Sequence, residues 1–201
     1  MITGRPVSLY LHFPFCVRKC RYCDFLSFPA QEEVRERYIS RLLKEIAVRG
    51  EELRGRQVPT IFIGGGTPSL MTAGQLSQVM EALYRHFDIA ADAEISMECN
   101  PGTVGGGACV RKGTSAADCS GQMTFTDIKK CGINRLSLGL QSADNVQLAI
   151  LGRIHTWEQF LASFEAAREA GFTNINVSTV STVSPSICHD LMGPDGMILV
   201  F

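Results

Sequence analysis

Strand-like segments that alternate with helical segments constrain the fold of this 201-residue chain more than any other feature. Polar and apolar side chains alternate in residues 7–13, 94–98, 135–140 and 174–177, and residues 60–63 form a short apolar run. Apolar side chains recur at helical spacing in residues 31–53, 72–87 and 156–171. Repeated strand–helix units of this kind predict a parallel sheet with helices packed outside it.

The predicted strands keep one polar or small face, which parallel strands buried on both sides do not have. The apolar face carries Leu9, Leu11, Ile95, Met97, Leu136, Leu138, Leu140, Ile175 and Val177. The other face carries Ser8, Tyr10, His12, Ser96, Glu98, Ser137, Gly139, Gln141, Asn174, Asn176 and Ser178. We interpret the second face as the lining of a cavity, which predicts an α/β barrel or partial barrel of about five parallel strands with a polar lumen. An antiparallel sheet with one wet face is the alternative, and the intervening helices argue against it.

Composition excludes several classes of protein. A hydrophobic content of 45%, a charged content of 19% and only 8 prolines exclude disordered and low-complexity chains. A net charge of −1 gives no electrostatic reason to expect nucleic acid or an anionic membrane as a partner. No apolar run has the length of a membrane span, and the first residues lack the pattern of a signal peptide. We therefore expect a cytoplasmic protein without a transmembrane segment.

Three of the eight cysteines, Cys16, Cys20 and Cys23, lie together in the loop after the first predicted strand. The remaining five are isolated in the sequence: Cys99, Cys109, Cys119, Cys131 and Cys188. Three thiolates on one loop can bind three irons of a [4Fe–4S] cluster and leave the fourth iron open. The alternative is zinc, which would require a fourth ligand such as His12 or Cys99. Between the three cysteines lie Arg18, Lys19 and Arg21, which favour thiolates and an anionic cluster if they are more than a solvated loop.

The residues LYLHFPFCVRKCRYCDF resemble the CxxxCxxC signature of the radical SAM superfamily. The segments FIGGGTPSLM, ECNPGT and INRLSLGLQSADNVQLAILGRIHT follow in the order and spacing of the HemW/HemN group, which resembles oxygen-independent coproporphyrinogen III oxidase. The match covers about residues 7–103 and 132–177. It implies a partial (βα)6 radical SAM barrel over residues 1–177, with 104–123 as an irregular, insert-like segment and 178–201 as an atypical tail.

The resemblance assigns roles to individual residues. It implies that Cys16, Cys20 and Cys23 bind the [4Fe–4S] cluster, and that S-adenosylmethionine chelates the open iron. Tyr22 would then pack against the adenine, and Tyr10 would approach the sulfonium. The remaining cofactor contacts that the resemblance implies are Gly65, Gly66, Thr67, Glu98, Gln141 and Arg153. The family carries an acidic residue where this chain has Ser178, which removes one expected cofactor contact.

The function implied by the resemblance depends on the branch of the group. The coproporphyrinogen III dehydrogenase branch carries a further cysteine two residues past the third, whereas here Asp24, Phe25 and Leu26 follow Cys23. This departure, and a chain that begins almost at the first strand, favour the HemW branch of heme chaperones. The expected partners are then heme or a porphyrin, a heme-acceptor protein and an electron donor. The alternatives are oxidation of a porphyrinogen propionate, or a fragment that holds a cluster without activity.

Two segments depart from the strand–helix pattern. Residues 104–122 contain five glycines and no apolar stripe, and only residues 125–131 have a helical pattern before the fourth strand. We therefore expect a mobile loop with no helix before Thr124, which would leave Met97 and Leu138 under-covered. In residues 178–201 we expect no sixth strand.

Overall fold

A computed structural model describes residues 4–105, 122–180 and 198–200 of the chain. Within these ranges, six parallel strands form one sheet whose spatial order equals the chain order. The strands are β1 (Leu9–Phe13), β2 (Gln57–Gly65), β3 (Asp88–Cys99), β4 (Arg135–Gln141), β5 (Asn174–Thr179) and β6 (Ile198–Val200). This confirms the predicted α/β fold with parallel strands and outer helices.

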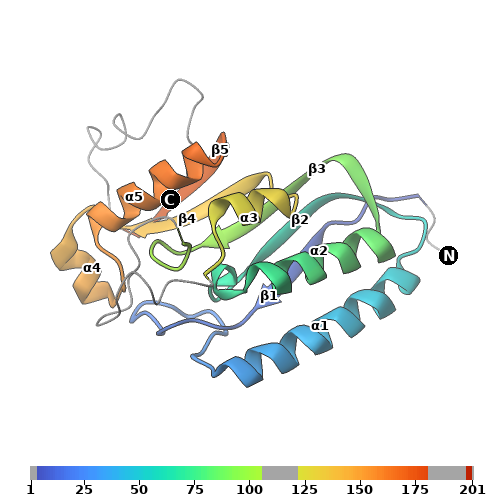
Figure 1. Ribbon diagram of the computed structural model, residues 1–201, viewed down its shortest axis with the longest axis horizontal. Helices are drawn as coiled ribbons and strands as arrows, with labels where there is room; N and C mark the ends of the chain where they lie inside the picture. The colour runs from blue at the N-terminus through green and yellow to red at the C-terminus, as the bar shows by residue number, and fades with distance from the viewer. Residues whose placement is uncertain (1–3, 106–121, 181–197, 201) are drawn as a thin grey trace.

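The helices are α1 (Glu32–Glu52), α2 (Ala73–His86), α3 (Phe125–Lys130), α4 (Asn145–Leu151) and α5 (Trp157–Glu169), with a short 3-10 turn η1 (Pro68–Leu70). Figure 1 shows α1, α2, α3 and α5 side by side along one face of the sheet, in the same order as the strands. Capping boxes at Thr72, Thr124 and Thr156 begin three of them, because each threonine accepts a hydrogen bond from the backbone three residues on. No helix in the described part of the chain is both long and apolar enough to span a bilayer.

The expectation of no sixth strand is wrong. Residues 198–200 pair in parallel with β5, where Ile198 lies opposite Asn176 and Val200 opposite Ser178. A three-residue apolar run is too short to reveal a strand by periodicity, and it is pairing with the neighbouring strand that defines it. The segment between β5 and β6, residues 181–197, lies outside the described residues.

The expected exposure of Met97 and Leu138 is also wrong, because both side chains are fully buried. The two ends of the irregular segment cover this region: Val104, Met123 and the α3 residue Ile128 belong to the same hydrophobic core. The ends are joined to each other, since the N–H of Gly105 donates to the carbonyl oxygen of Met123 at 2.8 Å. The expected mobile loop between them falls on residues 106–121, outside the described residues, whereas the predicted helix near residues 125–131 is present as α3.

The substitution Met97→Ala tests this core directly. Removing a fully buried methionine side chain leaves a cavity, so we expect the free energy of unfolding to fall by about 2–5 kcal/mol. Val48→Ala on the exposed face of α1 is the control and should change it by less than about 0.5 kcal/mol. Urea unfolding followed by circular dichroism measures both variants. Equal, small effects would show that the sheet is not covered at Met97.

Candidate cluster and cofactor site

The loop that carries the three cysteines is closed at its base by the backbone and by aromatic packing. The N–H of Cys16 donates to the carbonyl oxygen of Phe28 at 3.1 Å, and the N–H of Phe28 donates to that of Pro14 at 2.9 Å. The buried ring of Phe15 contacts the rings of Phe28 and Tyr38 edge-on. These contacts place residues 16–28, which we call the cluster loop, at the carboxyl end of β1, where α/β folds gather their active sites.

Each cysteine of the cluster loop is a free, half-buried thiol with a polar group beside its sulfur. The hydroxyl of Thr67 lies 3.5 Å from the Cys16 sulfur, and the Arg153 guanidinium lies 3.6 Å from the Cys20 sulfur. The Ser27 hydroxyl lies 3.9 Å from the sulfur of Cys23. Hydrogen-bond donors and a positive charge stabilise thiolates, the form that binds iron.

The three cysteines open into one cavity of about 300 Å³ at the carboxyl ends of the strands. Its lining contains nearly every residue that the sequence singled out: Cys16, Cys20, Tyr22, Cys23, Gly65, Gly66, Thr67, Glu98, Gln141 and Arg153. Ser137, Gly139 and Ser178 from the polar strand face, and Arg18 from the cluster loop, also line it. The predicted polar face therefore contributes five of its eleven residues to the cavity, all from β3, β4 and β5.

Tyr10 is the predicted site residue that does not line this cavity. It lies earlier on β1, opposite Phe62 of β2, with ring centroids 6.0 Å apart. The His12 ring lies between Tyr10 and the cluster loop: its Nε2 is 3.0 Å from the carbonyl oxygen of Leu26, and its Nδ1 is 3.2 Å from the Tyr10 hydroxyl. Since a carbonyl only accepts, Nε2 is the donor toward Leu26, and Nδ1 faces the Tyr10 hydroxyl.

The glycines at the end of β2 are required by close backbone packing. Gly65 has φ +114°, and a Cβ there would lie 2.5 Å from His12 Nδ1. The free N–H of Gly65 donates to the Glu98 carboxylate at 2.9 Å. Burial raises the pKa of Glu98, and the Gly65 hydrogen bond and His12 oppose this rise. The glycine segment therefore fixes the direction of the Glu98 carboxylate in the cavity.

Arg153 joins the cluster loop to the ends of β3 and β4. Its Nη2 donates to Asn100 Oδ1 at 2.7 Å and to the carbonyl oxygen of Gly139 at 2.9 Å. Asn100, whose amide also donates to the Thr67 hydroxyl at 2.9 Å, is a site residue that sequence reasoning missed. The signal was its position directly after the third strand. Burial and the neighbouring Arg153 lower the pKa of His155 to about 3, so this ring stays neutral beside the guanidinium.

Gln141 has a backbone conformation that is rare for its residue type. At φ +67° it is the one non-glycine residue with positive φ in the described ranges. Its Nε2 donates to the Ser178 hydroxyl at 3.2 Å, so this serine faces the cavity from β5. Strained backbone of this kind persists where the surrounding structure holds a side chain in a required place.

The side chains present fit a cluster better than a single zinc ion. In the part of the chain that the structure describes, no three His, Cys, Asp or Glu side chains converge on one ion position. A [4Fe–4S] cluster does not need such convergence, because each thiolate binds a different iron. His12 uses both ring nitrogens in hydrogen bonds, and burial raises the pKa of the Cys99 thiol far above its ordinary value. Zinc binding would therefore require His12 to give up a hydrogen bond or the buried Cys99 to lose its proton.

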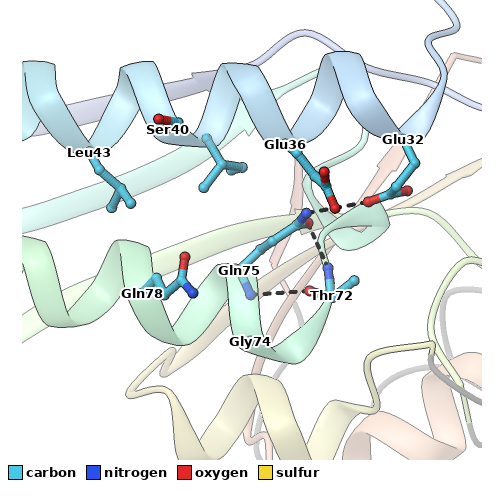
Figure 2. A pocket seen from close by; sticks show the side chains of 9 residues that line it. Glu32, Glu36, Ser40, Leu43, Thr72, Gly74, Gln75 and Gln78 are labelled. Atoms are coloured by element: carbon cyan, nitrogen blue, oxygen red, sulfur yellow. Dashed lines mark hydrogen bonds between the residues drawn. The ribbon is translucent and has the colours of Figure 1, made fainter.

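A second cavity, of about 470 Å³, lies between α1 and α2 on the helical side of the sheet. Figure 2 shows its wall, where Gln75 donates through Nε2 to Glu32 at 3.3 Å and forms the capping box with Thr72. Its polar groups thus hold the start of α2 against α1. No cysteine lines it, and we assign the cluster site to the first cavity.

A family model for the radical SAM superfamily matches residues 10–187. The chain belongs to the radical SAM superfamily. Membership of this superfamily implies a [4Fe–4S] cluster and S-adenosylmethionine as bound groups. The side chains suited to these two groups lie in the cluster loop and in the cavity that it lines.

Relatives of this radical SAM chain include the heme chaperone HemW of Escherichia coli K12, 36% identical over 194 residues, which are 96% of this chain and 47% of that protein. HemW of Mycobacterium tuberculosis H37Rv is 33% identical over 182 residues, 89% of this chain and 43% of that protein. The solved structure of coproporphyrinogen III oxidase HemN from Escherichia coli matches with a TM-score of 0.77 at 28% identity, covering 97% of this chain and 44% of that one. The chain therefore spans about half the length of the curated relatives it matches.

Titration of Glu98 gives a test of the site without any bound group. Because burial raises its pKa, the folded state binds the proton more tightly than the unfolded state. The free energy of unfolding should then fall as pH rises from the ordinary carboxyl range, near about 4.3, through the raised pKa. Glu98→Gln abolishes this fall, so the stability of the variant relative to the original chain should increase over the same window. Urea unfolding measures the free energy of unfolding of both proteins. If the difference between them does not vary with pH, the pKa of Glu98 is not raised in the folded state.

Proposed function

We propose that this chain is the radical SAM domain of a heme-handling protein of the HemW type, which binds heme for transfer to an acceptor protein in the cytoplasm. The observation that carries the proposal is the single cavity in which three free cysteines meet Arg153, Glu98 and the glycine end of β2. The choice of branch rests on the residues Asp24, Phe25 and Leu26 after Cys23, where the dehydrogenase branch carries a further cysteine two residues past the third. The similarity to HemW relatives over most of this chain supports the same choice.

In this proposal Cys16, Cys20 and Cys23 hold the [4Fe–4S] cluster, and S-adenosylmethionine occupies the rest of the cavity. When bound, these groups supply one-electron cleavage of the sulfonium to methionine and a 5′-deoxyadenosyl radical. The protein's part is to bind and orient. Arg153 makes no ion pair within the described residues, and its buried Nε lacks a hydrogen-bond partner there, so its charge suits an anionic ligand beside Cys20.

The other residues that line the cavity suit different chemical groups of S-adenosylmethionine. Glu98 accepts from Gly65 and leaves its second oxygen for a hydroxyl or ammonium group. The carbonyl-rich end of β2 suits an ammonium group, since glycine permits close approach to the backbone. Tyr22, which is exposed at 39%, offers a flat surface for a purine. Tyr10 and Phe62 stack on each other outside the cavity. They would contact a substrate that approaches the sulfonium from the lumen.

A second function, oxidation of a porphyrinogen propionate, is favoured by one observation, the structural match to coproporphyrinogen III oxidase HemN. The two functions differ in outcome. We expect anaerobic titration of the reconstituted chain with heme to show binding by absorbance. We expect no divinyl product when coproporphyrinogen III, S-adenosylmethionine and a reductant are supplied. Formation of the divinyl product would favour porphyrinogen oxidation over heme transfer. A chain that neither binds heme nor forms this product would be a cluster-binding domain without either function.

The cluster itself has a sharper test in a pair of cysteine variants. Anaerobic reconstitution should load about four irons per chain, and Cys20→Ala should abolish the iron–sulfur absorption because one of three iron ligands is lost. Cys131→Ala is the matched control, since this half-buried cysteine lies at the end of α3 and does not line the cavity. Retention of a full cluster by the Cys20 variant would overturn the ligand assignment, as would bound zinc in place of iron.

A further inference from the structure

The cluster loop caps the carboxyl end of α4. The last carbonyls of a helix lack partners within it, and here the loop binds the carbonyl of the last residue of α4 and those of the two residues that follow it. The N–H of Arg21 donates to the oxygen of Leu151 at 3.0 Å. The Nη2 of Arg18 donates to the oxygens of Gly152 at 2.8 Å and Arg153 at 3.1 Å. A cation at this end of a helix is also favoured by the helix dipole.

Arg153 in turn contacts the cluster loop. Arg18 binds the backbone of Arg153, while the Arg153 guanidinium lies 3.6 Å from the sulfur of Cys20 in the Arg18 loop. Gly152 turns the chain between α4 and Arg153, because its φ of +77° is a backbone conformation that favours glycine. The two arginines thus form a reciprocal pair in which each guanidinium holds the other's loop.

We propose that Arg18 is a positioning residue, which holds the cluster loop against residues 151–153 and so places the Arg153 guanidinium beside Cys20. The inference rests on the proposed function, because Arg153 is the cation offered to the carboxylate of S-adenosylmethionine. Arg18 borders the same cavity, and its guanidinium donates its hydrogen bonds to the backbone of Gly152 and Arg153. In this proposal its effect on the Arg153 guanidinium is transmitted through that backbone.

The other cations of the loop do not share this role. Lys19 donates to the carbonyl oxygen of Phe25 within the loop at 3.1 Å. In the described residues the Arg21 guanidinium makes no hydrogen bond, and its contact with Leu151 uses the backbone N–H. Arg21→Ala therefore removes the same charge from the same loop and leaves all three capping hydrogen bonds in place. It is the matched control for Arg18→Ala.

Hydrogen exchange of the unloaded chain tests the contact without any cofactor. In Arg18→Ala, amide exchange of Arg21 should be faster by about tenfold, the effect of losing one charged hydrogen bond. Arg21→Ala should leave the amide at that position close to its original rate. Arg18→Lys should fall between them, since an ammonium donates to carbonyls but lacks the guanidinium fork. Equal exchange in the Arg18→Ala and Arg21→Ala variants would overturn the inference.

The second arm tests positioning in the loaded chain. At equal cluster content, the concentration of S-adenosylmethionine that half-saturates the change in the electron paramagnetic resonance spectrum should rise about tenfold in Arg18→Ala. It should stay unchanged in Arg21→Ala and recover in part in Arg18→Lys. Faster exchange without this rise would make Arg18 a loop contact only, and would overturn the positioning role. If the original chain itself takes up no cluster, the proposed function fails, while the exchange arm still decides the contact.

Discussion

The close approach of the Gly66 backbone to the backbone of Phe15 is the contact on which the rest of the site depends. The N–H of Gly66 donates to the carbonyl oxygen of Phe13 at 2.8 Å, and a Cβ at this position would lie 2.6 Å from the carbonyl oxygen of Phe15. Only glycine allows the end of β2 to lie directly against the start of the cluster loop. This contact brings Thr67 to Cys16 and leaves the Gly65 N–H facing Glu98.

The pairing register of the parallel strands places the other residues of the site along the same edge of the sheet. Parallel strands end at the same edge, so Glu98 of β3 lies opposite Ser137 of β4, which lies opposite Asn176 of β5. Arg153 then ties this edge to the cluster loop through Asn100, Gly139 and Cys20. The result is a polar cavity in which the half-buried Glu98 carboxylate and the Arg153 guanidinium form a pair suited to a zwitterionic amino acid group.

The sequence was sufficient for those parts of the structure that local pattern controls. Alternation on the strands predicted the polar wall, because this pattern lies in adjacent residues. Asn100 was missed because its role depends on Arg153, which is 53 residues away and meets it only in the folded chain.

The wrong expectation for Met97 and Leu138 has a related cause. The glycine-rich composition of the segment between β3 and β4 predicts that it does not cover the sheet. Its two flanks nevertheless carry the apolar residues Val104, Met123 and Phe125, which pack in the core. Burial depends on where the flanks return in space, and composition averaged over the segment does not show it.

The central claim is that the three cysteines and the polar edge of the sheet form one site, in which a cluster with an open iron binds S-adenosylmethionine. Calorimetric titration of S-adenosylmethionine into the reconstituted chain and into the iron-free chain tests it most directly. The account predicts saturable one-to-one binding to the reconstituted chain and at least about a hundredfold weaker binding without iron, because the open iron supplies the chelating contacts. Equal affinity in both states would contradict it.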